Sequence, residues 1–185
     1  FYGCDGLVSV CISDLERWCE ITFGRADSNP LLDAHHLFLN GEEIRDLVIP
    51  NNVTFIGNSA FSGCNGLTSV TIPQNVTGIG NYAFEGCSGL ISITIPNSIT
   101  SIGENVFYGC SGLISVTIPN SVTNIGYQAF ANCSSLNSVI LPNSVTSIDY
   151  ASFRNCASLL SVNIPNSVSF IGELAFAGCS SLTIS

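Results

Sequence analysis

Two adjacent histidines and nine cysteines are the residues of this chain whose types could do chemistry. His35 and His36, with Asp33 nearby, could ligate a metal, and Cys19 with His35 could pair a nucleophile with a base. Adjacent histidines in a strand or turn usually point apart, and no further ligand pair has suitable spacing. Nothing in the sequence orients a base or supplies an oxyanion hole. We therefore predict no catalytic residue, no metal site and no bound cofactor.

The charged residues are few and unevenly distributed. The chain has thirteen acidic residues, four arginines and no lysine, and nine of the acids lie within residues 1–46. From residue 47 onward the charged residues are Glu85, Glu104, Asp149, Arg154 and Glu173. Binding of nucleic acid needs clustered cations, so this class is excluded, and anionic membrane surfaces are disfavoured. No apolar run approaches the ~18 residues of a membrane span, so we expect no membrane insertion.

Prolines and cysteines recur through the chain with a single period of 23 residues. The prolines are Pro50, Pro73, Pro96, Pro119, Pro142 and Pro165, and the cysteines are Cys64, Cys87, Cys110, Cys133, Cys156 and Cys179. Self-similarity at a fixed period is typical of a solenoid, in which each repeat buries its apolar face against its neighbours. The period therefore predicts the architecture and most of the core.

Residues 67–87 show how one repeat forms one turn. Val70 and Ile72 alternate with polar residues, which is the period of a strand with one buried face. Pro73 ends this strand because proline cannot donate to a ladder. A second short extended segment ends at Gly80, and an Ala-Phe pair packs on a third side. The residues expected inside are Leu67, Val70, Ile72, Val76, Ile79, Phe84 and Cys87.

The pattern Cys-x-x-Leu-x-x-Val-x-Ile-Pro-x-x-Val-x-x-Ile-Gly-x-x-Ala-Phe-x-x-Cys resembles the BspA-type leucine-rich repeat of bacterial surface proteins. It covers nearly the whole chain, with small departures at Leu141 and Asp149, which replace isoleucine and glycine. The resemblance implies a leucine-rich-repeat solenoid with one parallel strand per turn and short extended or 3-10 segments on the other sides. It also implies an extracellular or cell-surface protein that adheres or binds ligands without catalysis.

We expect a single solenoid over residues 1–185. Residues 1–12 are the end of a repeat, residues 13–49 are one turn enlarged by 14 residues, and residues 50–185 are six regular repeats, the last incomplete. The chain opens and closes in mid-repeat, so we interpret it as a fragment of a longer array.

The enlarged turn is expected to carry a short helix. Ser13 and Glu16 form a capping box, and Leu15, Trp18 and Cys19 fall on one helical face. We predict a helix from residue 14 to about residue 22 that bulges from the solenoid.

The second half of the enlarged turn contains Asn40-Gly41, which could form a hairpin turn. In register it occupies the corner where the next repeat has Gly63-Cys64, and Leu37-Phe38 stands where other turns have Ala-Phe. We therefore assign Asn40-Gly41 to the corner. Glu42-Glu43 has no converging carboxylate partner, so we expect a solvated surface there.

The cysteine column is expected to hold free, buried thiols. Parallel inward Cβ vectors fit the dihedral angle of a disulfide poorly, and buried cysteine behaves as a small hydrophobe. Cys4 joins this column, whereas Cys11 and Cys19 are out of register. Cys11 should face outward, which makes it the candidate for a reactive or cross-linked thiol.

The candidate ligand face consists of outward strand positions and aromatic residues. The strand positions form hydroxyl columns without charge, and tyrosines vary more within the array. The candidate residues are Ser69, Thr71, Ser92, Thr94, Ser115, Thr117, Tyr82, Tyr127 and Tyr150. The same small residues could instead serve only to let adjacent strands pack.

Three functions follow from these features. The first is an adhesion or ligand-binding module that contacts host proteins or glycans. The second is a passive spacer in a larger surface protein, which the near-identical repeats favour. The third is binding through the enlarged turn at residues 13–49. Bare solenoid ends also permit end-to-end association.

Overall fold

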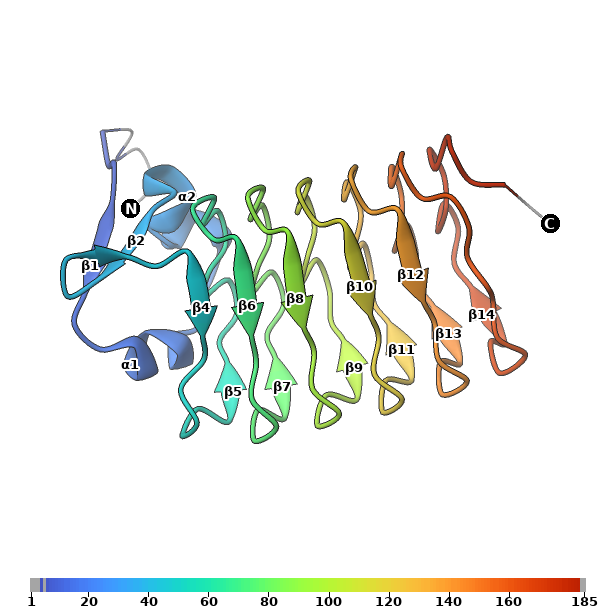
Figure 1. Cartoon of the computed structure of the whole chain (residues 1–185), viewed down its shortest axis with the longest axis horizontal. Coiled ribbons are helices and arrows are strands. Elements are labelled where there is room, and N and C mark those ends of the chain that lie inside the picture. Colours follow the sequence, from blue (N-terminus) through green and yellow to red (C-terminus); the bar gives the residue numbers. More distant parts are fainter. Residues whose placement is uncertain (1–3, 5, 184–185) are drawn as a thin grey trace.

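The computed structural model describes residue 4 and residues 6–183, and it shows a solenoid of stacked turns (Figure 1). One strand per turn forms the first side, and shorter strands form the second side. The first-side strands are β4 (Asp46–Val48), β6 (Ser69–Thr71), β8 (Ser92–Thr94), β10 (Ser115–Thr117) and β12 (Ser138–Ile140). The second-side strands are β5 (Phe55–Ile56), β7 (Gly78–Ile79), β9 (Ser101–Ile102), β11 (Asn124–Ile125), β13 (Ser147–Ile148) and β14 (Phe170–Ile171).

Strands of successive turns pair in parallel, and each residue faces the residue 23 positions further along. On the first side, Ser69 pairs with Ser92 and Ser115 pairs with Ser138. On the second side, Ile125 pairs with Ile148 in the same way. The 23-residue leucine-rich-repeat solenoid expected from the sequence is confirmed, because an identical residue spacing brings identical side chains into contact between turns.

The third side of each turn consists of hydrogen-bonded turns rather than strands. Phe84 N donates to Val106 O at 3.0 Å, and Phe107 N donates to Ala129 O at 2.9 Å. Each repeat has a left-handed residue here at the Tyr82 position, where φ is 61°. A second one falls at the Gly86 position, which only glycine and asparagine occupy in the six repeats, since both tolerate this conformation.

The core agrees with the predicted inward positions. All seven side chains named for the repeat of residues 67–87 are buried. The phenylalanines stack along the axis, with ring centroids of neighbouring turns 5.2–5.7 Å apart. These rings are Phe61, Phe84, Phe107, Phe130, Phe153 and Phe176. One continuous apolar column therefore runs the length of the regular repeats.

All nine cysteines are free, and those from Cys64 to Cys156 that share the 23-residue period are buried, as predicted. Cys179 is half-buried at the last turn. The prediction for Cys4 is wrong, because its side chain is exposed. The enlarged turn at residues 13–49 does not follow the path of a 23-residue repeat. The 23-residue spacing therefore does not place Cys4 next to the buried cysteines of the regular turns.

The enlarged turn contains α1 (Leu15–Glu20), η1 (Ala26–Ser28), α2 (Leu31–Ala34) and the strands β1 (Val10–Ile12), β2 (Leu37–Leu39) and β3 (Glu42–Glu43). Helix α1 is confirmed, although its cap is Asp14 instead of Ser13. Asp14 Oδ1 accepts a hydrogen bond from Arg17 N at 3.0 Å. An aspartate in extended conformation satisfies this role directly.

Helix α1 does not bulge from the solenoid, contrary to the prediction; it covers the N-terminal end of the core. Gly57 N donates to Cys19 O at 2.8 Å, as Gly80 N donates to Ile56 O one turn later. Trp18 Nε1 donates to Ala60 O at 2.9 Å. The helix thus takes the place of a preceding turn, because an uncovered first turn would leave apolar side chains in water.

The assignment of Asn40-Gly41 to a corner is also wrong. Strands β2 and β3 pair antiparallel, with Leu39 opposite Glu42, so these two residues form the turn of a hairpin. Both have positive φ, 52° and 92°, which favours Asn-Gly in a two-residue hairpin loop. Leu37-Phe38 accordingly lies in a strand that pairs with β1, and not at an Ala-Phe position. Local turn chemistry prevails here over the repeat register.

Candidate functional site

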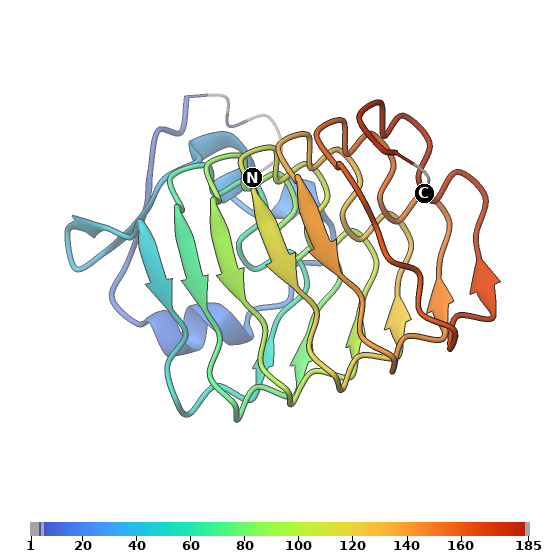
Figure 2. The same cartoon turned by 45° about the vertical axis from the view of Figure 1, so that its right-hand side comes forward.

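The strands of the first side lie next to one another along the solenoid (Figure 2). Their outward residues form the hydroxyl columns predicted from the sequence. In each strand one buried apolar residue lies between two outward residues, as Val116 lies between Ser115 and Thr117. The outward residues of β8 and β10 are exposed, and Thr71 is exposed in β6. We call these outward residues of β6, β8, β10 and β12 the strand face.

Most hydroxyls of the strand face have no hydrogen-bond partner among residues 4 and 6–183. No described residue accepts a hydrogen bond from the side chains of Thr71, Ser92, Thr94, Ser115 or Thr117. Two hydroxyl columns elsewhere behave differently, because most of their members donate to a carbonyl of the preceding turn. Their bonds include Ser98 to Val76 O, Ser121 to Ile99 O, Ser144 to Val122 O, Thr123 to Thr100 O and Thr146 to Thr123 O. The strand-face hydroxyls therefore remain available to solvent or a ligand.

Apolar side chains flank the hydroxyls on the same face. Ile91, Ile114 and Leu160 recur one position before the serines and are exposed, as is Ile140 in the threonine column. Sequence reasoning did not include the Ile91, Ile114 and Leu160 positions in the face, although their shared 23-residue spacing was a usable signal. Uncharged hydroxyls beside exposed aliphatic groups form a surface that can contact an uncharged partner.

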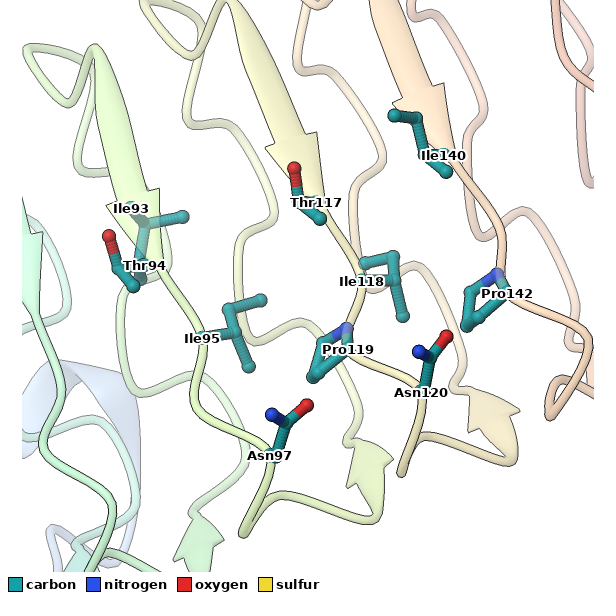
Figure 3. Close-up of a pocket in the computed structure, with 10 residues that line it drawn as sticks. All are labelled: Ile93, Thr94, Ile95, Asn97, Thr117, Ile118, Pro119, Asn120, Ile140 and Pro142. Carbon is teal, nitrogen blue, oxygen red and sulfur yellow. The ribbon is translucent and has the colours of Figure 1, made fainter.

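A shallow groove of about 450 Å³ lies at the C-terminal ends of the central strands (Figure 3). Thr94, Thr117 and Ile140 line it at the ends of β8, β10 and β12. Asn97 and Asn120 line it on the segments that follow. The groove connects the strand face with the proline turns, so a ligand there would meet apolar, hydroxyl and amide groups together.

Charge appears at the N-terminal end of this face. Asp46 Oδ1 accepts hydrogen bonds from Ser69 Oγ at 2.5 Å and Thr68 Oγ1 at 3.0 Å, which lower the pKa of Asp46. The expectation that Glu43 is merely solvated is wrong, because it bonds His36 at 2.6 Å and Arg45 at 2.7 Å. These two bonds lower the pKa of Glu43. Glu43 is thus paired with Arg45, whereas the carboxylate of Asp46 is held by two neutral hydroxyls.

The candidate chemistry of the histidines and of Cys19 is not assembled. His35 Nδ1 lies 3.1 Å from Gly63 O while His36 faces Glu43, so the two rings have different partners. Burial raises the pKa of the Cys19 thiol to about 12, which is opposite to the activation of a nucleophile. Among the described residues, no group of three or more His, Cys, Asp or Glu side chains could hold a metal ion.

The tyrosines of the candidate face lie on the third side, apart from the strand face. Tyr127 and Tyr150 occupy one column and stack, with ring centroids 5.3 Å apart and planes 12° apart. Tyr82 is in the neighbouring column, and its hydroxyl donates to Glu104 Oε1 at 2.5 Å. We call the column of Glu104, Tyr127, Tyr150 and Glu173 the tyrosine ridge. The nine candidate residues thus form two surfaces and not one.

Comparisons with known proteins agree with the repeat. A family model described as "BspA type Leucine rich repeat region (6 copies)" matches residues 34–159. A comparison with curated proteins returned no match. Within the part of the chain that the structure describes, no helix is long and apolar enough to cross a membrane.

Solved structures of bacterial proteins are similar to the chain. A leucine rich cell surface protein of Faecalibacterium prausnitzii is 39% identical, with a TM-score of 0.64 over 66% of this chain and 32% of that protein. A leucine-rich repeat protein of Bacteroides ovatus is 35% identical, with a TM-score of 0.57 over 74% of this chain and 44% of that one. The leucine-rich repeat protein of T. pallidum is 32% identical, with a TM-score of 0.66 over 75% and 78%. The chain spans less than half of the first two proteins.

Proposed function

The chain belongs to the BspA-type leucine-rich repeat family, and we propose that it is a non-enzymatic ligand-binding or adhesion module of a bacterial surface protein. Its ligand is a host protein or glycan, and its location is extracellular or on the cell surface. The cell-surface description of the F. prausnitzii relative supports the location. No nucleic acid is expected as a partner, because the chain has only four arginines and no lysine.

The free hydroxyls of the strand face are the observation that supports binding there. Hydroxyls that donate to backbone carbonyls, as in the columns of Ser98 and Thr123, are not free to bind a ligand, whereas most hydroxyls of the strand face are. On the strand face, Thr94 and Thr117 donate to no described residue and line the groove with Ile140. Repetition of the same groups along the face suits a weak contact that is repeated along an extended partner.

The spacer is the competing function, and the near-identical strand face favours it. A spacer needs a rigid stack but no ligand, so both functions predict the same fold. Binding through the enlarged turn has less support, because its polar groups hold the first regular turn. Asn29 Nδ2, for example, donates to Ser59 O at 2.6 Å.

Binding to an immobilised panel of extracellular-matrix proteins and glycans tests the proposal. Thr117→Arg places an unpaired charge in the centre of the strand face and should weaken saturable binding by about tenfold or more. Ser101→Arg is the matched control, since Ser101 is an exposed strand serine on the second side. Equal binding by both variants would move the site away from the strand face, and no binding by the unaltered chain would favour the spacer.

A further inference from the structure

The tyrosine ridge combines an exposed aromatic stack with carboxylates. Tyr127 is 43% exposed and stacks on Tyr150 of the next turn. Backbone bonds from the neighbouring column, such as Gln128 N to Tyr150 O at 3.0 Å, hold these positions in register. The stack covers one face of each ring, so the other two faces look toward the flanking turns. Glu104 occupies the ridge position in one of these turns, and Glu173 occupies it in the other.

The two glutamates have no cationic partner in the part of the chain that the structure describes. None of the ion pairs among the described residues includes Glu104 or Glu173. Tyr82 donates to Oε1 of Glu104 while Asn81 Oδ1 accepts from the Glu104 backbone N at 3.1 Å, so this residue is held in place from both ends. No described residue donates to Oε2 of Glu104. A fixed carboxylate with a free oxygen therefore lies one turn from an exposed tyrosine ring.

A third carboxylate lies directly before the ridge, in the one repeat that has no glycine at that position. The position before the ridge is glycine in the other five repeats, as at Gly126 and Gly172. A Cβ on Gly172 would come within 2.4 Å of Tyr150 N, which explains the preference for glycine. Asp149 is the exception, and it directly precedes Tyr150. The packing of the repeat disfavours a side chain here, so the packing does not account for this aspartate.

The ridge position varies between repeats, as do the neighbouring columns of Tyr82 and Glu85, whereas the strand face is nearly uniform. The strand face repeats serine at the Ser69 position in five consecutive turns. The ridge position reads Asn58, Asn81, Glu104, Tyr127, Tyr150 and Glu173 in successive turns. A uniform scaffold needs no such change at an exposed position. Local divergence toward aromatic and acidic residues indicates a contact that is specific to these turns.

We propose that the tyrosine ridge binds arginine side chains of a basic protein segment. A guanidinium group stacks on an aromatic ring and presents a planar fork to a carboxylate, which a lysine ammonium does not. The outer ring faces of the stack offer a surface for stacking, and the flanking glutamates offer carboxylates one turn away. Residues 104–173 carry three carboxylates and one arginine, so the region of the ridge has a net negative charge that attracts such a segment from solution. The ridge lies on another side of the coil than the strand face, so this proposal is independent of the function proposed above.

Fluorescence anisotropy with two labelled peptides tests the ridge. One peptide carries two arginines in a glycine-serine background, and the other carries citrulline in their place, which keeps the shape without the charge. The unaltered chain should bind the arginine peptide about tenfold more tightly than the citrulline peptide. Tyr127→Leu with Tyr150→Leu should remove most of this difference, whereas Tyr127→Phe with Tyr150→Phe should keep it, since phenylalanine retains the ring.

Three controls separate the ridge from general charge and from misfolding. Tyr108→Leu alters a tyrosine outside the ridge and should leave arginine binding unchanged. Each variant should keep the melting temperature of the unaltered chain by circular dichroism. Glu104→Gln with Glu173→Gln should weaken binding as the leucine pair does. If arginine binding is lost in the glutamine pair but kept in the leucine pair, the proposal is overturned in favour of diffuse charge. Equal binding of the arginine and citrulline peptides by the unaltered chain would also overturn it. Binding of the strand face to the panel of matrix proteins and glycans should be unchanged in all of these ridge variants, so a failure of this proposal is distinct from a failure of the proposed function.

Discussion

The thiol of Cys110 donates a hydrogen bond to the carbonyl oxygen of Phe84 on the preceding turn, at 3.1 Å. The same bond joins Cys87 to Phe61 O, Cys133 to Phe107 O, Cys156 to Phe130 O and Cys179 to Phe153 O. The cysteine column therefore links successive turns in addition to filling space. This explains why a small residue with a donor recurs there and not alanine.

Replacing Cys110 by serine should destabilise the protein by roughly 1–3 kcal/mol. A hydroxyl keeps a donor but reaches less far than a thiol, so the bond to Phe84 O lengthens and packing is lost. Urea unfolding measures the free energy, with Cys11→Ser as the exposed control. A neutral effect at Cys110 would mean that the column is solvated.

The thiols should also be free in solution. Alkylation under denaturing conditions, followed by mass spectrometry, should show at least seven free thiols of the nine cysteines. Burial blocks oxidation of the column, and only Cys4 and Cys11 are exposed. Three or more disulfides would contradict the structure of the column.

Tyr82 should titrate above the usual range of a tyrosine. Its hydrogen bond to Glu104 raises the pKa of the phenol to about 12, because ionisation would remove the donated proton and place two negative charges together. A raised pKa in the folded state stabilises the fold below the ordinary value of about 10, and this contribution is lost as the pH rises through 12. Absorbance titration of the phenolate should show one late transition that disappears in Tyr82→Phe. Its persistence in Glu104→Gln would exclude the glutamate as the cause.

Asp46 should titrate below the usual range of an aspartate. Hydrogen bonds from Ser69 and then Thr68 favour the ionised carboxylate and lower its pKa. The resulting stability is present above the ordinary pKa and is lost as the pH falls through the lowered one. Ser69→Ala should raise the pKa of Asp46, as followed by NMR of the carboxyl carbon. Ser92→Ala, which alters a hydroxyl without a partner, should leave it unchanged.

The N-terminal cap should contribute measurably to stability. Asn29 is fully buried, donates to Ser59 O at 2.6 Å and accepts from Leu31 N at 2.9 Å. Asn29→Ala leaves a buried donor and acceptor unpaired and should cost about 1–3 kcal/mol in urea unfolding. Asn52→Ala in an exposed turn is the control. If both substitutions are equally mild, residues 13–49 do not act as a cap.

The sequence by itself determined the repeated part of this protein. The 23-residue spacing of Pro73, Val70 and Cys87 determines which side chains face inward, since each turn must stack on a turn of the same length. The hydroxyl columns of the strand face follow from the same alternation. The replacement of the usual glycine by Asp149 is visible in the sequence, but the residues that Asp149 meets on neighbouring turns are not.

Only the tertiary structure decided the parts that do not repeat and the pairing of side chains across turns. In the enlarged turn, local chemistry at Asn40-Gly41 competes with the repeat register, and the hairpin prevails because its positive φ values suit these residues. The bond of Tyr82 to Glu104 joins residues 22 positions apart, so it depends on how neighbouring turns stack. The same stacking places the tyrosines and the strand face on different sides, because the path of the chain around the core determines which side each residue occupies.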